Sequence, residues 1–401
     1  MTKLKILRIV PFFYPAFGYG GPVIHSYNIS KIQAQLGYDV NVFTTNIIKH
    51  NLISNTLPRY EIVQGIKIHR FPIRFKIKNS HYWITPSMIP NILKSNSDLI
   101  HAHTFRTFQT DIASFLSKIK RKPFIITAHG NMRDLTELAI LKGTSSSKLI
   151  KIHDKFVKSL CISAADKIIV HSKYEAYWTK RIGINEDKIE VIPHGVDVEK
   201  FSDHTLKEKF LNRFQFQGKL ILYVGRILRN YRNLHDLIKM MPSIIEEVSD
   251  VKLLLIGESF DLDYEMELRK LVSSQNLSNY VHFITNPTWE DIIGGYLSAN
   301  VFVFPTNRSE SFGIPLLEAG AAHCPVVAPK IGPVPELVKN NYSGLLTKPA
   351  DQNDLKKKVL RILTDNKLER TLGDNGYKRI SSAYTWKVVA ESINNLYSEL
   401  I

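Results

Sequence analysis

The chain of 401 residues reads LILYVGR from Leu220 to Arg226, a run of five apolar residues that ends on a glycine and an arginine. A strand in which nearly every residue is apolar is typical of a parallel sheet that helices bury on both faces. Similar short runs occur at residues 4–10, 40–44, 99–102, 124–128, 167–170, 189–192, 252–256, 281–284, 301–304 and 326–328. Longer helix-compatible stretches separate these runs, so the sequence predicts an α/β protein.

The runs form two sets of about 190 residues each, which predicts two doubly wound, Rossmann-like domains. Turn residues from Pro193 to Asp197 close the first set. We therefore expect one domain over residues 1–195, a second over 196–380, and a C-terminal helix over 381–401 that packs back on the first domain.

The positive charge of the chain is concentrated in its first half. The net charge is +16, and residues 1–200 hold 29 Lys and Arg against 14 Asp and Glu, whereas residues 201–401 hold 24 against 23. Such an asymmetry favours an anionic partner, which could be a phospholipid, a lipid-linked phosphate or a nucleic acid.

The cysteines and the apolar segments of the chain indicate in which cellular compartment we expect the protein. Cys161 and Cys324 are isolated in the sequence, which suits a reducing compartment better than a disulfide framework. No window approaches 18 uninterrupted apolar residues, and residues 1–10 are too short an apolar run for a signal peptide. We expect a cytoplasmic protein whose membrane contact, at the inner face of the cell membrane, is peripheral.

A glycine-rich turn, FGYGGP from Phe17 to Pro22, follows the first apolar run. Gly20 and Gly21 would let the backbone approach a ligand closely, and the helix start after them offers N–H groups to a phosphate. The spacing does not match GxGxxG, so a merely structural turn remains an equal alternative.

Two arginines occur at and after the end of the stretch from Leu220 to Arg226. Arg226 is its last residue, and Arg232 lies six positions later. Strand ends of open α/β sheets face the ligand crevice, where two guanidinium groups could clamp a diphosphate and stabilise its charge as it leaves. The alternative is a solvated basic loop that also contains Arg229.

The most specific signal is the stretch ESFGIPLLEA from Glu310 to Ala319. It predicts a loop followed by a helix that begins near Ile314, with the backbone amides of Ser311, Phe312 and Gly313 forming an anion-binding nest. Glu318 could accept both hydroxyls of a ribose, and Glu310 could reach a sugar. A capping role is the alternative for either acid alone.

Taken in order, these motifs resemble the retaining glycosyltransferases of family 4, which have the GT-B fold of two Rossmann-like domains facing a central cleft. The stretch from Glu310 to Glu318 resembles the E-x7-E motif of that family. Other similar stretches are residues 14–21, 98–103, 127–130, 191–197, 332–336 and Gly344.

The resemblance implies a role for each matching residue. Glu318 would hold the nucleotide ribose and Glu310 the donor sugar, both in a C-terminal nucleotide-sugar domain. Arg226 and Arg232 would hold the diphosphate with amides near Gly313. In the N-terminal acceptor-side domain, Gly20 and Gly21 would contact phosphate or acceptor, and His129 would lie beside the transferred sugar. The chain departs from the pattern at Arg232, where lysine is usual, and at His194, where asparagine is common.

The resemblance also implies a reaction. The enzyme would move a hexose-type sugar from a UDP- or GDP-sugar to a lipid-linked or polysaccharide acceptor, with retention of anomeric configuration. We expect no cofactor besides the donor substrate and no metal ion, with the leaving phosphate accepting the acceptor's proton. Alternatives are a nucleotide-sugar epimerase or hydrolase of the same fold, an inactive partner subunit, or a nucleic-acid-binding protein, which would leave the acidic pair unexplained.

Two basic stretches with apolar and aromatic residues, 66–78 and 105–122, suit an anionic membrane surface. A buried strand with solvated lysines is an equal alternative for the first of them.

Overall fold

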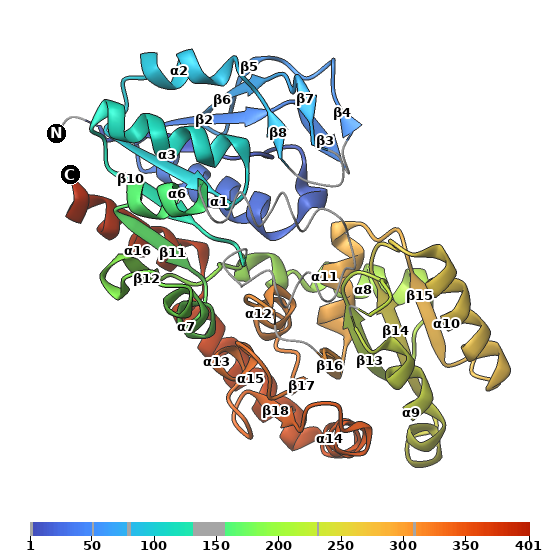
Figure 1. Cartoon of the computed structure of the whole chain (residues 1–401). Helices are drawn as coiled ribbons and strands as arrows, with labels where there is room; N and C mark the ends of the chain where they lie inside the picture. The colour runs from blue at the N-terminus through green and yellow to red at the C-terminus, as the bar shows by residue number, and fades with distance from the viewer. Residues whose placement is uncertain (1–2, 50–51, 78–81, 131–156, 231, 308–309) are drawn as a thin grey trace. The chain divides into compact units, whose positions relative to one another are not determined.

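The computed structural model describes residues 3–49, 52–77, 82–130, 157–230, 232–307 and 310–401. The chain divides into two compact units, and each is described by itself below (Figure 1). Unit 1 comprises Met1–His194 and Trp386–Ile401, and unit 2 comprises Gly195–Thr385.

The sheet of unit 1 is parallel except at one edge, where β5 runs antiparallel to β6. Its central strands are almost entirely buried, because helices cover both faces. In spatial order the strands are β12 (Ile189–Val191), β11 (Lys167–Val170), β10 (Phe124–Thr127), β9 (Leu99–His103), β1 (Lys5–Ile9), β2 (Asp39–Thr45), β6 (Ile66–Phe71) and β5 (Tyr60–Val63).

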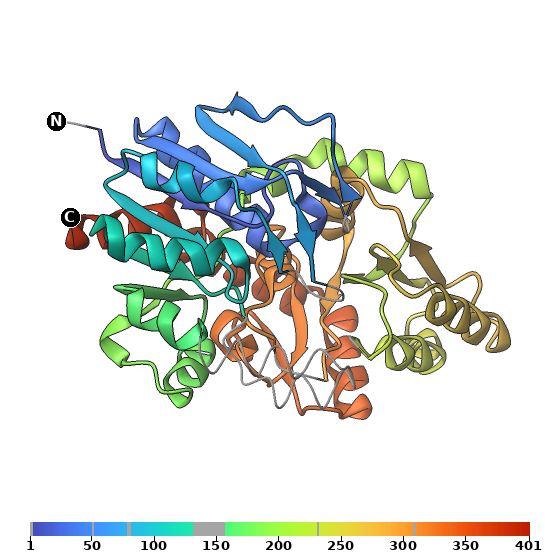
Figure 2. The same ribbon diagram turned by 45° about the horizontal axis from the view of Figure 1, so that its top comes forward.

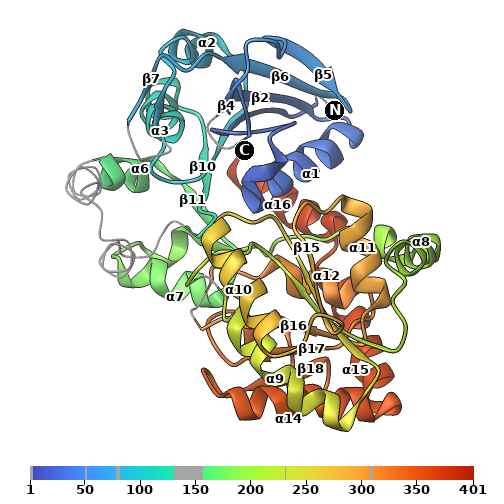
Figure 3. The same cartoon turned by 90° about the vertical axis from the view of Figure 1, so that its right-hand side faces the viewer.

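Two groups of helices bury the faces of this sheet (Figures 2 and 3). One face packs against α2 (Met88–Lys94), α3 (Phe108–Lys120) and α6 (Ser159–Ala164), and the other against α1 (Gly21–Gln35) and α16 (Trp386–Leu400). The helix α7 (Lys173–Arg181) follows β11, and the side chain of Ser172 caps it by accepting the N–H of Glu175.

Short elements complete unit 1. They are the antiparallel pairs β3 (Ile47–Lys49) with β4 (Leu52–Ile53) and β7 (Phe75–Lys76) with β8 (Trp83–Ile84), and the 3-10 turns η1 (Phe17–Tyr19) and η3 (Glu186–Lys188).

The sheet of unit 2 has six strands, all parallel to their neighbours. In spatial order they are β15 (Val281–Ile284), β14 (Val251–Ile256), β13 (Lys219–Val224), β16 (Val301–Val303), β17 (Val326–Pro329) and β18 (Gly344–Thr347). Leu222 of β13 is in register with Leu254 on one side and with Phe302 on the other. The strand that opened our sequence analysis therefore lies inside the sheet, as its composition predicts.

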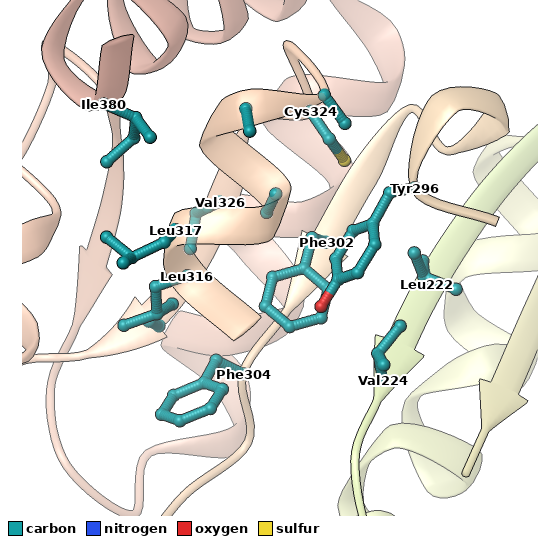
Figure 4. Close-up of a cluster of buried hydrophobic side chains, with 14 of the residues drawn as sticks. Leu222, Val224, Tyr296, Phe302, Phe304, Leu316, Leu317, Cys324, Val326 and Ile380 are labelled. Carbon is teal, nitrogen blue, oxygen red and sulfur yellow. The ribbon is translucent and has the colours of Figure 1, made fainter. Parts of the chain in front are cut away.

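Helices cover both faces of this sheet as well. One face packs on α8 (His204–Phe214), α11 (Trp289–Ser298), α12 (Ile314–Ala321) and α15 (Asn366–Ala383), together with η4 (Val198–Ser202) and α13 (Val334–Leu337). Figure 4 shows this core, where Leu316 and Leu317 of α12 lie near Phe302 and Phe304. The other face packs on α9 (Leu234–Glu247), α10 (Leu262–Ser274) and α14 (Gln352–Thr364).

The C-terminal segment differs in its start from our expectation. Residues 381–385 stay with unit 2 because α15 continues to Ala383, and the segment that joins unit 1 begins at Trp386. Val389, Ile393 and Tyr397 of α16 are fully buried in the core that contains β1.

The first part of the basic stretch 66–78, residues 66–71, forms strand β6 of the sheet, in which Ile66 and Ile68 are buried. The buried-strand alternative is therefore the right one for residues 66–71. Within the part of the chain that the structure describes, no helix has the length and apolar character needed to cross a bilayer.

Candidate active site

The carboxyl ends of parallel strands in open α/β sheets are where ligands bind. In unit 2 this edge carries Arg226 directly after β13 and the loop to Glu310 after β16. The helix α12 starts at Ile314, so the predicted loop and helix lie where the sequence places them.

Arg232 and Glu310 form an ion pair, in which the Arg232 Nη1–H donates to Glu310 Oε1. The Arg232 side chain is buried and its guanidinium carbon lies 4.4 Å from the ring centroid of Phe304. Glu310 is less buried, with 19% of its side chain exposed. The structure thus brings together the arginine expected to bind phosphate and the glutamate expected to bind sugar, and joins them to each other.

Arg226 has a different environment. It is exposed, its guanidinium carbon lies 5.3 Å from the ring centroid of Phe260, and its carbonyl accepts the Tyr223 hydroxyl at 2.9 Å. Arg229 pairs instead with Glu267 at 2.7 Å and with Asp261 at 3.7 Å. Arg229 therefore matches the description of a basic surface loop, whereas Arg226 lies over the ring of Phe260 at the strand end.

Glu318 lies in the second turn of α12, where Tyr296 donates its hydroxyl hydrogen to Glu318 Oε2 at 3.0 Å. Burial raises the pKa of Glu318 to about 7, and the hydrogen bond from Tyr296 opposes this rise. Near neutral pH the carboxyl is therefore poised between its two protonation states.

Gly313 is the residue that starts α12, and its φ of 117° lies in a region that side-chain-bearing residues rarely adopt. Phe312 beside it is buried in the core of unit 2, and Ser311 is partly buried. The glycine lets the chain turn from the buried Phe312 into the helix, which places the backbone of Ser311, Phe312 and Gly313 at the helix N-terminus.

In unit 1 the glycine-rich turn precedes α1 at the carboxyl end of β1. Gly20 has a φ of 75° and is the N-cap of α1, and Pro22 occupies its first turn. The Gly21 carbonyl accepts a hydrogen bond from His194 Nε2 at 3.2 Å. The two predicted glycines and the unusual His194 are therefore neighbours.

A cluster of histidines occupies the same edge of the sheet of unit 1. The ring centroid of His25 in α1 lies 4.9–6.0 Å from those of four strand-end histidines, His103, His129, His171 and His194. Our sequence analysis missed His25 and His171 as members. The available signal was positional, since His103, His171 and His194 each come at or just after the end of an apolar run.

His129 is held by its neighbours on both sides. Its ring bonds to His103 at 2.9 Å and to His171 at 3.1 Å, and its backbone has a φ of 52°. Glu175 joins the same loops, accepting the N–H of Gly130 at 2.7 Å and that of His171 at 2.8 Å. A left-handed backbone at a non-glycine residue persists only where its surroundings hold it, and such residues concentrate at functional sites.

Four histidines of this cluster, His25, His103, His129 and His171, are held in the neutral form by burial. Burial lowers the pKa of His25, His103 and His129 well below the usual range, and that of His171 to about 3. Their mutual proximity adds to the effect, since each positive charge would repel the next. Among the described residues, no group of three or more His, Cys, Asp or Glu is arranged to hold a metal ion.

Comparisons with known proteins agree with this architecture. Residues 19–200 match the model of Glycosyltransferase Family 4, and residues 206–379 match that of Glycosyl transferases group 1. An uncharacterized glycosyltransferase of Methanocaldococcus jannaschii is 23% identical over 417 residues and covers 100% of both chains. The phosphatidyl-myo-inositol mannosyltransferase of Mycolicibacterium smegmatis is 24% identical over 382 residues, 94% of this chain and 90% of its own.

A solved structure shows the same fold. Anabaena HepE in complex with UDP and glucose has a TM-score of 0.77 and 19% identity, over 99% of this chain and 100% of HepE. The predicted GT-B architecture of two α/β domains is thereby confirmed. From the two family models, which follow one another along the chain, and from this fold, we conclude that the chain is a glycosyltransferase of the family 4 type.

Proposed function

We propose that this enzyme transfers a hexose from a UDP- or GDP-sugar to a lipid-linked or polysaccharide acceptor, with retention of configuration and without a metal ion. HepE was solved with UDP and glucose, and the Mycolicibacterium smegmatis relative is a phosphatidyl-myo-inositol mannosyltransferase. Both support a nucleotide-sugar donor, and the second supports a lipid acceptor.

The observation that carries the proposal is the set of charged residues at one edge of the sheet of unit 2. Arg226 follows β13, the Arg232–Glu310 pair joins the loops after β13 and β16, and Glu318 follows in α12. Two guanidinium groups suit a diphosphate, and a carboxylate suits the hydroxyls of a ribose. No single residue of the set would identify a nucleotide-sugar site, but the four together offer partners for the diphosphate, the ribose and the sugar of such a donor.

The proposed mechanism follows from these charges. Fixed cations stabilise the negative charge that develops on the departing diphosphate, which is the main demand of the reaction. Arg226 is free of an ion pair with the described carboxylates and can bind the diphosphate directly. Arg232 becomes available when the phosphate displaces Glu310, and Glu310 can then reach the sugar. The leaving phosphate takes the proton of the acceptor hydroxyl.

A product assay tests the proposal. Purified enzyme is incubated with UDP- and GDP-hexoses, with and without extracted lipids, and the products are resolved by NMR for anomeric configuration. We expect an acceptor-dependent glycoside with the donor's configuration. An epimerised donor, or free sugar unaffected by acceptor, would favour the epimerase or hydrolase alternative. Loss of activity in EDTA with recovery in Mg²⁺ or Mn²⁺ would contradict the metal-free part.

For the acceptor side we propose peripheral binding of unit 1 to an anionic membrane at the inner face of the cell membrane. The helix α3 exposes Phe115 by 67% and Ile119 by 57%, one turn apart, although most helices bury such residues. Phe105 in the same predicted stretch is buried, so the surface is narrower than the sequence suggested.

Charge supports the same surface. Exposed Leu93 of α2 and Leu160 of α6 lie on helices that share a core with α3. These helices and their flanks carry Lys94, Lys118, Lys120, Arg121 and Lys122, whereas Asp111 of α3 is buried and Asp166, two residues after α6, is exposed. Protruding apolar side chains among predominantly basic ones match the interface of a bilayer that contains anionic lipid.

Vesicle flotation tests this surface. The double variant Phe115→Ser/Ile119→Ser should lose binding to vesicles that contain anionic lipid. The matched control is Leu262→Ser/Met266→Ser on α10, which has the same spacing and exposure beside Asp261, Asp263 and Glu265, and should bind like wild type. Equal binding of both double variants, or no preference for anionic lipid, would contradict the membrane contact.

A further inference from the structure

Three histidines of unit 1 form a hydrogen-bonded chain that ends on a backbone carbonyl. His103 Nδ1 lies 2.9 Å from His129 Nε2, and His129 Nδ1 lies 3.1 Å from His171 Nε2. His171 Nδ1 lies 3.0 Å from the carbonyl oxygen of Ile192. The chain thus crosses from the end of β9, through the loop after β10, to the loop after β11.

The carbonyl at the end of this chain fixes the proton on every ring. A carbonyl oxygen only accepts, so His171 Nδ1 carries hydrogen and, in the neutral ring, His171 Nε2 accepts. His129 must then donate from Nδ1 and accept at Nε2. His103 must in turn donate from Nδ1, so all three are neutral Nδ1–H tautomers.

While the other rings keep these tautomers, a second proton on His129 or His171 would place two N–H groups against each other, and one on His103 Nε2 would be buried without an acceptor among the described residues. The surroundings also oppose positive charge. His101, stacked on His103 with ring centroids 4.4 Å apart, is fully buried, and so is Arg8. Arg8 donates to Ser30, Gln33 and Tyr397, all of them uncharged, and its field lowers the pKa of His103 further after burial and the neighbouring histidines.

The protonation of the other end of the hydrogen-bonded chain, at His103 Nε2, follows from the same argument. His103 Nε2 is left as an acceptor, and among the described residues no hydrogen-bond donor reaches it. No described group at His103 therefore fixes the donor-to-acceptor direction of the three hydrogen bonds, which depends on the Ile192 carbonyl at the other end. Both ring nitrogens of His129 are used within the chain, so neither remains as an acid or base for a substrate.

We propose that His171 and His103 are positioning residues that lock His129 as a neutral Nδ1–H imidazole, so that His129 serves transfer through its fixed ring and backbone and not by proton transfer. This inference rests on the proposed function for the presence of His129 at the sugar. Three features hold His129 in its left-handed conformation: the two ring hydrogen bonds and the Glu175 bridge between Gly130 and His171.

Two substitutions of His171 distinguish the effect of its hydrogen bond to His129 from the effect of its packing. In His171→Gln the side-chain oxygen can take the place of Nε2 and still accept from His129. In His171→Leu no acceptor remains, which allows the chain to reverse so that His103 and His129 carry hydrogen on Nε2. His171 reaches His103 only through His129 in this chain of hydrogen bonds. A changed tautomer at His103 in a His171 variant would therefore show that the tautomer is transmitted through His129.

Nitrogen-15 NMR of histidine-labelled full-length enzyme reads the tautomers directly. We expect Nδ1–H at His103, His129 and His171 in wild type, retention at His103 in His171→Gln, and a shift toward Nε2–H at His103 in His171→Leu. An Nε2–H tautomer or an imidazolium at His129 in wild type near neutral pH would overturn the proposal. An unchanged Nδ1–H tautomer at His103 in a folded His171→Leu variant would also overturn it. If that variant does not fold, the tautomers measured in the wild-type spectrum decide the question.

Kinetics supply the second readout. Misplacement of a substrate-facing group by about 1 Å costs up to about 100-fold in rate, so kcat of His171→Leu should fall about 10- to 100-fold, with a smaller loss in His171→Gln. If the tautomers behave as expected while kcat is unchanged in both variants, the positioning role fails and the tautomer chain stands. If wild type transfers no sugar at all, the proposed function fails and the NMR result still tests the chain.

Discussion

The guanidinium of Arg232 is bonded to the carboxylate of Glu310, although 78 residues separate them in the chain. The arginine is nearly inaccessible to water and the glutamate is the more exposed partner. A buried cation needs a compensating anion, and the phosphate of a bound donor could replace the Glu310 carboxylate in that role. We therefore expect donor binding at Arg232 to release Glu310.

Removing the glutamate should destabilise the enzyme and improve phosphate binding. In Glu310→Gln, Arg232 stays buried beside a neutral amide, so the free energy of unfolding should fall by up to about 3 kcal/mol. The melting temperature without ligand should drop, and the rise on adding UDP should exceed that of wild type. Differential scanning fluorimetry with and without UDP measures both.

The control for this prediction is Glu267→Gln. It removes a partner of the more exposed Arg229, and exposed ion pairs contribute little to stability. It should change neither the melting temperature nor the UDP response appreciably. A Glu310→Gln variant whose UDP response equals that of wild type would show that phosphate does not compete for Arg232.

Arg226 should matter for catalysis and not for stability. Its side chain is exposed at the end of β13, so Arg226→Ala leaves no buried group without a partner. Loss of one charge-stabilising donor should raise the activation barrier by about 3 kcal/mol, which is a drop in kcat of more than 100-fold. Steady-state rates with saturating donor measure it.

Arg229→Ala is the matched control for Arg226→Ala, because Arg229 lies three residues away and pairs with Glu267 and Asp261. Its kcat should stay near that of wild type. Equal losses in both variants would point to the overall charge of the loop, and an unchanged Arg226→Ala would remove this residue from the mechanism.

Glu318 should make nucleotide binding depend on pH. With a pKa of about 7, the carboxyl is mostly protonated at pH 6 and mostly ionised at pH 8, and only the ionised form accepts from both ribose hydroxyls. UDP affinity should therefore rise about tenfold between these pH values, as the ionised fraction does. Isothermal titration calorimetry at pH 6, 7 and 8 measures the trend.

The same pKa has a consequence for stability with the opposite sign. Because the folded pKa lies above the ordinary glutamate value of 4.5, the folded state binds more protons between pH 4.5 and 7, and the contribution of Glu318 to stability decreases as pH rises through that window. In Glu318→Gln both pH dependences should vanish, with weaker UDP binding at pH 8. A variant that keeps the wild-type pH trend in UDP affinity would assign that trend to another group.

The sequence predicted the sheets because strands buried on both faces differ in composition from everything around them. Leu220 to Val224 is such a run, and it occupies an inner position of its sheet. The start of the helix at Ile314 followed from the glycine and proline beside it. These signals are local, so one sequence suffices to find them.

The partners of the site residues could not be predicted, because they depend on strand order. Glu310 bonds to Arg232 only because β13 and β16 are neighbours in the sheet, although β14 and β15 lie between them in the chain. His171 was missed for the same reason, because only the parallel pairing of β9, β10 and β11 brings its ring to those of His103 and His129. His25 lies on α1, so its place in the cluster depends on the packing of that helix.

Unit 1 should lose stability steeply in acid because its buried histidines are neutral when folded. Burial holds the pKa values of His25, His101, His103, His129 and His171 below 6.5 in the folded state. Their contribution is fully present above pH 6.5 and is lost as pH falls toward the folded values, where unfolding takes up protons. Each such histidine adds up to about 1.4 kcal/mol per pH unit to the loss.

Replacement of His25 isolates one part of this effect. Both of its ring nitrogens are buried and lack a hydrogen-bond partner among the described residues, so His25→Leu should raise the free energy of unfolding by about 1–3 kcal/mol at pH 8. The gain should be larger at pH 5.5, because the variant no longer has to keep that ring neutral. Urea unfolding at the two pH values measures it, with exposed His204→Gln as the control. Parallel pH curves for wild type and His25→Leu would mean that His25 is charged in the folded protein, which the neutral cluster forbids.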